Sequence, residues 1–375
     1  MPDAINPEMV KLARRAQSLS QTELAERLGI PQPYVSRFES GVAPSIPVPI
    51  TSMADALAVP AALLTRFETV HDPSKATNHY RKKASVTKGS LDTAHARINL
   101  ARIRIARLLD EIDLESPCRV PKLRVVADEQ TPEQIAGAVR RDWQMPVGPA
   151  AHLIASIERA GCLVVPLDFG CDDIDAVHHH CPGLPPFFFF NSSKPADRIR
   201  FSISHEIGHL VMHDVSAEAM EKEANQFAAE FLMPADEIFE ELSTSLSIRT
   251  LAHLKRKWRV SMAAIIFRAK EIGAIAETRA TNLFIELSRA GWRTKEPFPI
   301  APETPTLLRS ICDAFMTEDE YSLEDLATIA LCRVADIEAM IYPERRSTGI
   351  IQFHAQSPAS HAASSHPLHE NEDLH

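Results

Sequence analysis

Residues 201–211 read Phe201-Ser-Ile-Ser-His-Glu-Ile-Gly-His-Leu-Val211, and this stretch decides how the centre of the chain folds. It contains the pattern H-E-x-x-H. On an α-helix, residues four apart share one face, so His205 and His209 can place two imidazole nitrogens on one metal ion. Glu206 is offset, so its carboxylate can reach a water on the metal. Apolar residues around the motif predict that this helix packs in a core: Phe201, Ile203, Ile207, Leu210 and Val211.

A third metal ligand must come from outside the motif. The metzincin pattern requires glycine at 212 and histidine at 215, where this chain has Met212 and Val215, so that class is excluded. The next helical segment is 221–234, and its apolar face includes small residues that allow close approach to the first helix. Those residues are Ala224, Ala228 and Ala229.

This second segment also carries the acidic candidates for the third ligand. Glu221 and Asn225 lie four residues apart on one face, so one can bind the metal while the other orients a ligand. Glu218 and Glu223 remain alternatives. Glu223 lies about 200° around the helix from Glu221, so only one of those two can face the metal.

Three stretches in combination resemble the ImmA/IrrE family of bacterial metallopeptidases. They are Asp197-Arg-Ile-Arg-Phe201, His205-Glu-Ile-Gly-His209, and Glu221-x-x-x-Asn225-x-Phe-Ala-Ala-x-Phe-Leu-Met-Pro234. In that family the two histidines and a glutamate four residues before the asparagine bind zinc, and the glutamate of the motif is the general base. The resemblance, which spans residues 120–275, implies Zn²⁺ bound by His205, His209 and Glu221, with Glu206 as catalytic base.

The N-terminal stretch 19–41 predicts a helix, a tight turn and a second helix. Ser20 and Glu23 have the spacing of a capping box. Gly29 can take the positive φ that ends a helix. With Val35 and Phe38 in the core, the outer face of the last helix carries Gln32, Pro33, Ser36 and Arg37, with Tyr34 near its edge.

These polar side chains suit DNA. Glutamine pairs bidentately with adenine and arginine with guanine, so Gln32 and Arg37 can read bases, while Gln21 can fix a phosphate. The stretch resembles the Cro/CI-type (XRE) helix-turn-helix family at Ser20-Gln21, Ala25, Gly29, Gln32, Val35 and Glu39-Ser-Gly41. In that family the third helix reads the major groove as a dimer. The resemblance thus implies a double-stranded DNA operator and a homodimer. Pro33 departs from the usual Ser or Thr and leaves base preference open.

Charge is divided unevenly along the chain. The 375 residues have a net charge of −10, but residues 1–107 hold 15 Lys/Arg and 9 Asp/Glu, a net of +6 against −16 for the rest. The basic residues at 81–107 predict extra attraction to phosphate. There is no apolar stretch of 18 residues and no secretory pattern at the start, so a membrane span and export are not expected. Six scattered cysteines, without a CxxC pair, favour a reducing cytoplasm and no cysteine-based zinc site.

The sequence predicts a mainly α chain: an all-α helix-turn-helix bundle, then a small α+β zincin-like domain. Buried strands are expected at 161–166 and 187–190, whereas His178-His-His180 is interpreted as a loop. The predicted units are the helix-turn-helix domain (1–67), a basic linker and helix (68–118, ordered as a helix from 96), the metallopeptidase-like domain (119–280), a helical block (281–346) and a disordered histidine-containing tail (347–375).

This combination predicts a cytoplasmic DNA-binding transcriptional regulator with a zinc metallopeptidase domain. The domain would cleave a helix-turn-helix repressor, as is typical of the ImmA/IrrE family, or the chain's own linker at 68–95. One alternative is a ligand-sensing factor similar to acyl-CoA-responsive regulators, with a catalytically silent peptidase fold. Such relatives usually have a longer cysteine-bearing C-terminal region, whereas the C-terminal block of this chain contains only Cys312 and Cys332. Another alternative is the antitoxin of a toxin–antitoxin pair.

Overall fold

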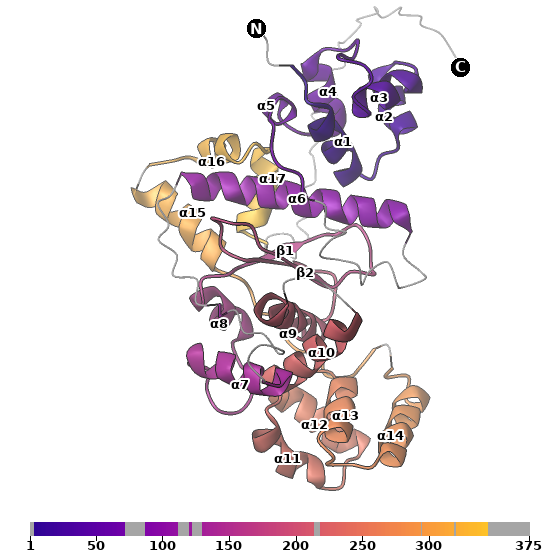
Figure 1. Cartoon of the computed structure of the whole chain (residues 1–375), viewed down its shortest axis with the longest axis vertical. Coiled ribbons are helices and arrows are strands. Elements are labelled where there is room, and N and C mark those ends of the chain that lie inside the picture. Colours follow the sequence, from indigo (N-terminus) through magenta and orange to yellow (C-terminus); the bar gives the residue numbers. More distant parts are fainter. Residues whose placement is uncertain are drawn as a thin grey trace, which may run out of the picture.

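The computed structural model describes residues 4–71, 87–111, 120–121, 130–213, 218–293, 295–318 and 320–343. These residues are mainly helical with one small sheet, which confirms the predicted fold class. The N-terminal helices lie at one end, the sheet lies between helices in the middle, and a second helical group lies at the other end (Figure 1). The predicted tail at 347–375 lies outside the described residues.

The N-terminal domain is a bundle of five short helices. They are α1 (Pro7–Ala16), α2 (Gln21–Leu28), α3 (Gln32–Glu39), α4 (Ile50–Leu57) and α5 (Ala61–Leu64). The capping box of Ser20 and Glu23 is present, and Gly29 ends α2 at φ 66°. Helical periodicity predicts one stretch from 50 to 65, but Ala58 turns left-handed and Pro60 cannot continue a helix, so α4 and α5 are separate.

A buried ion pair fixes the first helix of this domain to the third. The Arg14 Nε and Nη2 atoms donate to the two carboxylate oxygens of Glu39 at 2.6 and 2.7 Å. The two side chains are only 9% and 3% exposed. Gln21 Nε2 donates to the same Glu39 carboxylate at 2.9 Å, so the start of α2 is tied into the network.

Glu39→Ala should therefore destabilise the domain by about 3 kcal/mol, because it leaves the buried Arg14 guanidinium without its counter-charge. Thermal and urea unfolding of the full chain measure the change. Glu8→Ala removes the exposed pair with Lys11, at 3.6 Å, and is the matched control, with an expected change below about 0.5 kcal/mol. Equal effects of the two substitutions would show that Glu39 contributes no more than a surface charge.

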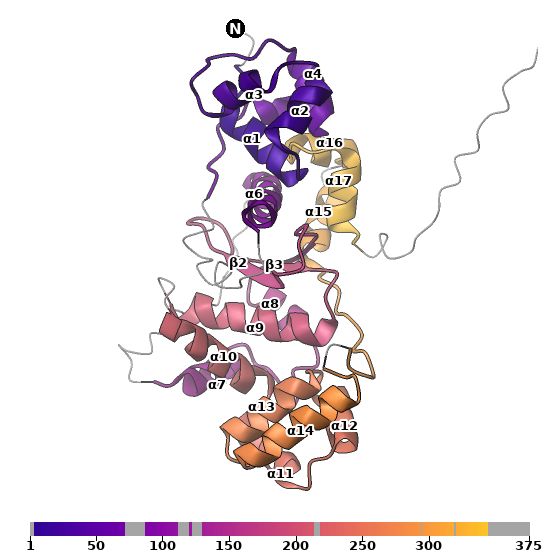
Figure 2. The same cartoon turned by 90° about the vertical axis from the view of Figure 1, so that its right-hand side faces the viewer.

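The long helix α6 (Lys88–Asp110) lies between the N-terminal domain and the sheet (Figures 1 and 2). It begins at 88, so the prediction of weak order up to 95 is wrong for residues 88–95. Two apolar faces explain the extra length. Ala96, Leu100 and Ile103 join the core of the N-terminal domain. Opposite them lie residues that join the core above the sheet: Ala94, Ile98, Ala101, Ile105 and Leu108.

The arginines of α6 do not form the phosphate-directed surface that their number predicts. They are used inside the chain: Arg97 pairs with Asp168 at 2.8 Å, Arg104 with Asp336 at 3.5 Å and Arg107 with Glu68 at 3.1 Å, while buried Arg102 donates to the carbonyl of Thr69. A helix packed on both sides must neutralise its charges locally, which is the reason for this correction. Residues 81–83 lie outside the described part.

The sheet has three strands in the order β1-β3-β2: β1 (Leu163–Leu167), β2 (Ala176–His179) and β3 (Phe187–Asn191). β1 pairs parallel with β3, and β2 pairs antiparallel with it. The two predicted strands are thus confirmed. The loop interpretation is wrong for His178 and His179, because a strand of four residues gives little sequence pattern and is held by pairing with β3.

Successive residues of the central strand point to opposite faces of the sheet. Phe187 and Phe189 pack beneath α6, and Phe188 and Phe190 pack in the core that includes α9. The same alternation in β2 sends Val177 toward α6 and Ala176 toward α9. All five residues of β3 are buried, so β3 anchors both layers.

Beneath the sheet lie α7 (Pro132–Asp142), α8 (Leu153–Arg159), α9 (Ala196–Met212) and α10 (Glu218–Leu232). The helices α9 and α10 pack closely together. A Cβ atom at Gly208 would lie 3.2 Å from the Phe227 ring, an unusually tight contact, so glycine suits this close approach. Ala224 and Ala228 on α10 are fully buried, as the small-residue pattern predicts.

The helical block predicted after 280 divides into two groups. α14 (Glu277–Arg289) packs on α12 (Ile248–Trp258) and α13 (Met262–Glu271) at the far end of the molecule, where α11 (Ala235–Ser243) packs on α13. The other group returns to α6 and the sheet (Figure 2): α15 (Leu307–Glu318), α16 (Leu323–Ile329) and α17 (Val334–Ile341). Within the described residues, every helix is too short or too polar to cross a membrane.

Candidate metal centre

The predicted ligands come together where α9 meets α10. The Nε2 atoms of His205 and His209 lie 3.0 Å apart. Glu221 reaches across from α10, with carboxylate oxygens 2.8 Å from His209 Nε2 and 3.6 Å from His205 Nε2. Tetrahedral zinc separates its nitrogen and oxygen ligands by about 3.3 Å. The three side chains therefore have the spacing of a metal-ligand set.

Neighbouring side chains turn both imidazoles toward this point. Asn225 Oδ1 lies 3.0 Å from His205 Nδ1 and can accept a hydrogen bond from it. Glu223 Oε2 lies 2.9 Å from His213 Nε2, and His213 Nδ1 lies 2.9 Å from His209 Nδ1. In this series of hydrogen bonds, the Glu223 carboxylate accepts from His213 Nε2, and His213 Nδ1 accepts from His209 Nδ1. Both histidines then carry their proton on Nδ1 and present a lone pair on Nε2.

Two lone pairs facing each other across 3.0 Å repel each other unless a cation lies between them. Burial would lower the pKa of His205, but the hydrogen bond that the Glu221 carboxylate accepts from it and the charges of Glu206 and Glu221 raise it. The site thus favours positive charge. Two imidazole nitrogens and one carboxylate are a common ligand set for catalytic zinc, so the residues present fit that ion.

Glu206 lies on the same helix, and its carboxylate faces the sheet. His178 of β2 approaches it twice: the backbone nitrogen lies 3.2 Å and the ring Nδ1 2.6 Å from Glu206 Oε2. Burial alone would raise the pKa of Glu206, but the His178 hydrogen bond and the three nearby histidines lower it to about 2. The carboxylate is therefore ionised and can accept a proton.

The alternatives for the third ligand are placed differently. Glu223 is paired with His213, which in turn contacts His209, so Glu223 supports the histidines from outside the ligand set. The side chain of Glu218 lies outside the described residues. The geometry thus favours Glu221, as the sequence resemblance implies.

The outer face of α3 presents the residues predicted to meet DNA. Tyr34 is 50% exposed, Pro33 and Arg37 are exposed, and Gln32 and Ser36 are half-buried. Gln32 Nε2 donates to Gln21 Oε1 at 3.0 Å, so the two amides that the sequence assigns to DNA orient each other. Gln21 in turn donates to Glu39. These side chains are held in place before any DNA is bound.

Comparison with protein families agrees with the arrangement of both the candidate metal centre and the N-terminal helices. Residues 157–270 match the family model of the IrrE N-terminal-like domain, and residues 10–64 match a helix-turn-helix model. The chain joins a helix-turn-helix domain to an IrrE-like domain. Both predicted resemblances are confirmed, and the helix-turn-helix match supports DNA binding. No curated protein matches the chain.

The sequence did not reveal two groups around the IrrE-like centre. The sequence pattern predicts a loop at His178, whereas alternation along β2 places it on the side of α9. The four-residue spacing from His209 indicates that His213 can lie near the centre, but the sequence offers Glu223 only as an alternative ligand and does not pair it with His213.

Gln32→Ala should weaken specific DNA binding by roughly 10- to 100-fold, because a bidentate base contact contributes about 1–3 kcal/mol of discrimination. The substitution also removes the hydrogen bond that Gln21 Oε1 accepts, while Gln21 still donates to Glu39. The measurement is fluorescence anisotropy on an operator selected from random duplexes, at two salt concentrations. Thr22→Ala, at an exposed neighbouring position, is the control. An unchanged affinity for operator over random DNA would show that Gln32 does not read a base.

Proposed function

We propose that the chain is a cytoplasmic transcriptional regulator that binds operator DNA as a homodimer and carries an active zinc metallopeptidase domain. One observation carries the enzymatic half: His205, His209 and Glu221 place ligand atoms within 4.8 Å of one another, beside an ionised carboxylate. The helix-turn-helix match supports the DNA-binding half. A protein that acts on a bacterial operator works in the cytoplasm.

The residues of the centre have distinct roles in this proposal. His205, His209 and Glu221 would hold the zinc, which supplies a Lewis acid for the peptide carbonyl and lowers the pKa of water. Glu206 accepts a proton at its carboxylate and returns it to the leaving amine. His178 holds that carboxylate, and Asn225 and His213 keep the two ligand imidazoles in the correct tautomer.

Two substrates are compatible with the proposal. One is a helix-turn-helix repressor, which the family resemblance implies. The other is the chain itself, within the predicted linker at 68–95. Residues 88–95 belong to α6, whose backbone is helical from Lys88 and whose Thr93 and Ala94 side chains are buried, so self-cleavage is expected before residue 88.

Incubation of the purified chain with and without one equivalent of Zn²⁺ tests the proposal. Intact-mass spectrometry detects self-cleavage, and N-terminal peptide mapping of a lysate from the source bacterium detects a cut repressor. New N-termini should depend on zinc and disappear with a chelator. The peptidase half fails if no cut appears in either substrate under conditions in which operator binding persists.

The ligand-sensing alternative has less support from the C-terminal helices. Cys312 and Cys332 are buried in the core between α6, the sheet and α15–α17. Burial raises the pKa of these thiols to about 12 and about 11, which makes them unreactive packing groups. A thermal shift with acyl-CoA and none with zinc would nevertheless favour a sensor. Growth rescue from a co-expressed neighbouring toxin would favour an antitoxin.

His178→Ala should lower kcat about 10- to 100-fold with little change in zinc content, since loss of a residue that orients a catalytic group typically has this size. His178→Gln can still donate to Glu206 and should recover part of the loss. The pH profile is the decisive readout, because Glu206 without its partner titrates at higher pH, and its acidic limb should move upward. An unmoved acidic limb would mean that His178 has only a structural role.

A further inference from the structure

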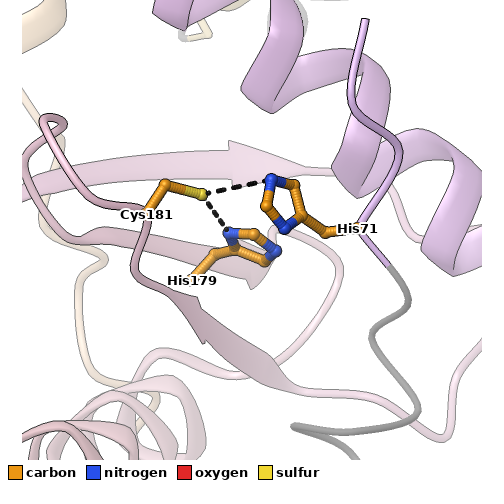
Figure 3. A group of neighbouring side chains, drawn as sticks. All are labelled: His71, His179 and Cys181. Carbon is orange, nitrogen blue, oxygen red and sulfur yellow. Dashed lines mark hydrogen bonds between the residues drawn. The ribbon is translucent and has the colours of Figure 1, made fainter.

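A second cluster of metal-binding side chains lies on the opposite face of the sheet from the peptidase centre. His71 comes from the segment that leaves the N-terminal domain, His179 from the end of β2, and Cys181 from the turn that follows (Figure 3). Cys181 Sγ lies 3.6 Å from His71 Nε2 and 3.3 Å from His179 Nδ1. Figure 3 shows a ring nitrogen of each histidine directed at the sulfur.

These distances are those of a coordination shell. In tetrahedral zinc with Zn–N of about 2.05 Å and Zn–S of about 2.3 Å, nitrogen and sulfur ligands lie about 3.6 Å apart. The ligand atoms of all three residues lie within 4.8 Å of one another. His179 is 9% exposed and Cys181 is 5% exposed, whereas His71 is half-buried and leaves a path from solvent.

The surrounding residues hold His71 in place. Its backbone nitrogen donates to Asn99 Oδ1 at 2.9 Å, and Asn99 Nδ2 donates back to its carbonyl at 3.0 Å. Asn99 lies on α6 and is 2% exposed, so this is a buried and paired anchor. The buried Asn99 side chain thus fixes the backbone of His71. This places the His71 imidazole beside Cys181.

The guanidinium of Arg102 lies beside the Cys181 sulfur. Burial raises the pKa of Cys181, while the guanidinium of Arg102 beside it opposes that rise by a hydrogen bond and by its charge. Glu68 lies near enough to Arg102 to offset part of its positive charge.

We propose that His71, His179 and Cys181 form a second site for a transition-metal cation of the zinc class, with a fourth position open to water or another ligand. Two nitrogens and one thiolate select zinc or cobalt over magnesium and calcium, which prefer oxygen. The ion links the segment leaving the DNA-binding domain to β2. On its other face, β2 presents His178 to Glu206. His179 of the proposed site is therefore the next residue after His178, which holds the Glu206 carboxylate of the peptidase centre.

Titration with Co²⁺ distinguishes the two sites, because only the second contains a thiolate. Charge-transfer absorption between thiolate and cobalt in the near ultraviolet should appear in His205→Ala, which lacks the peptidase centre, with an end point of one equivalent. It should disappear in the double variant His205→Ala/Cys181→Ser. His205→Ala/Cys171→Ser is the matched control, because Cys171 is a half-buried cysteine outside the cluster, and it should keep the band.

A measurement on the unaltered chain avoids any effect of the substitutions on folding. Zn²⁺ should slow alkylation of Cys181 at least 10-fold, as read by peptide mass spectrometry, and leave Cys171 unaffected. The site is overturned if His205→Ala gives no thiolate band with Co²⁺, or if Zn²⁺ does not protect Cys181. Either result leaves the peptidase proposal intact, since that proposal depends on the other face of the sheet.

Discussion

Glu206→Gln should reduce the rate of peptide cleavage by about 10³-fold while zinc content and operator affinity stay unchanged. General acid–base catalysis contributes about 10²–10⁴-fold, and a 10³-fold loss is about 4 kcal/mol of transition-state stabilisation. Glutamine has the same shape, and its carbonyl oxygen can still accept from His178, which lies 2.6 Å from the carboxylate. The change thus removes the proton acceptor and little else.

The measurement follows the zinc-dependent N-termini found with the wild-type chain, under single-turnover conditions. Glu240→Gln makes the same chemical change at an exposed position of α11 and should keep full activity. Metal content is determined on the same samples. If Glu206→Gln cleaves at the wild-type rate, the proton is accepted elsewhere and the assignment of Glu206 is wrong.

His205→Ala should lose one equivalent of bound zinc and all detectable peptidase activity. The variant removes one of three ligands and also releases Asn225, whose oxygen lies 3.0 Å from His205 Nδ1. Two remaining ligands hold zinc weakly, because a catalytic site normally needs three from the protein. Operator binding should persist, because the helix-turn-helix domain has its own core around α1–α5.

Metal analysis of the purified proteins by mass spectrometry measures the loss, and anisotropy on the operator confirms that the domain is folded. His253→Ala replaces an exposed histidine of α12 and is the control for removing an imidazole. Unchanged zinc content in His205→Ala would contradict the ligand set. Full cleavage activity without the metal would contradict the proposed mechanism as a whole.

The parts that the sequence predicts well are those whose signal is local. The capping box of Ser20 and Glu23, the stop at Gly29 and the pattern of His205 and His209 all depend on residues within one or two turns of a helix. The family resemblance adds Glu221, and α9 and α10 bring it to the two histidines. The buried strand at 187–190 is also evident from composition, because four consecutive phenylalanines need two apolar layers.

Other features depend on contacts between residues that are far apart in the sequence. The arginines of α6 suggest a surface for phosphate when read along the helix, yet they are neutralised by partners as distant as Asp168 and Asp336. The position of His178 against Glu206 depends on β2, whose four residues form a strand only because β3 lies beside them.

By itself, the sequence determined the helix-turn-helix fold, the helix that carries the H-E-x-x-H pattern and the residues on the outer face of α3, because helical periodicity and capping are encoded in neighbouring residues. Only the tertiary structure decided that α6 joins the domains instead of binding phosphate, and that His71 meets His179 and Cys181. His71 lies more than 100 residues from the other two in the sequence. Their contact depends on how a helix and a sheet pack, and no local spacing reports it.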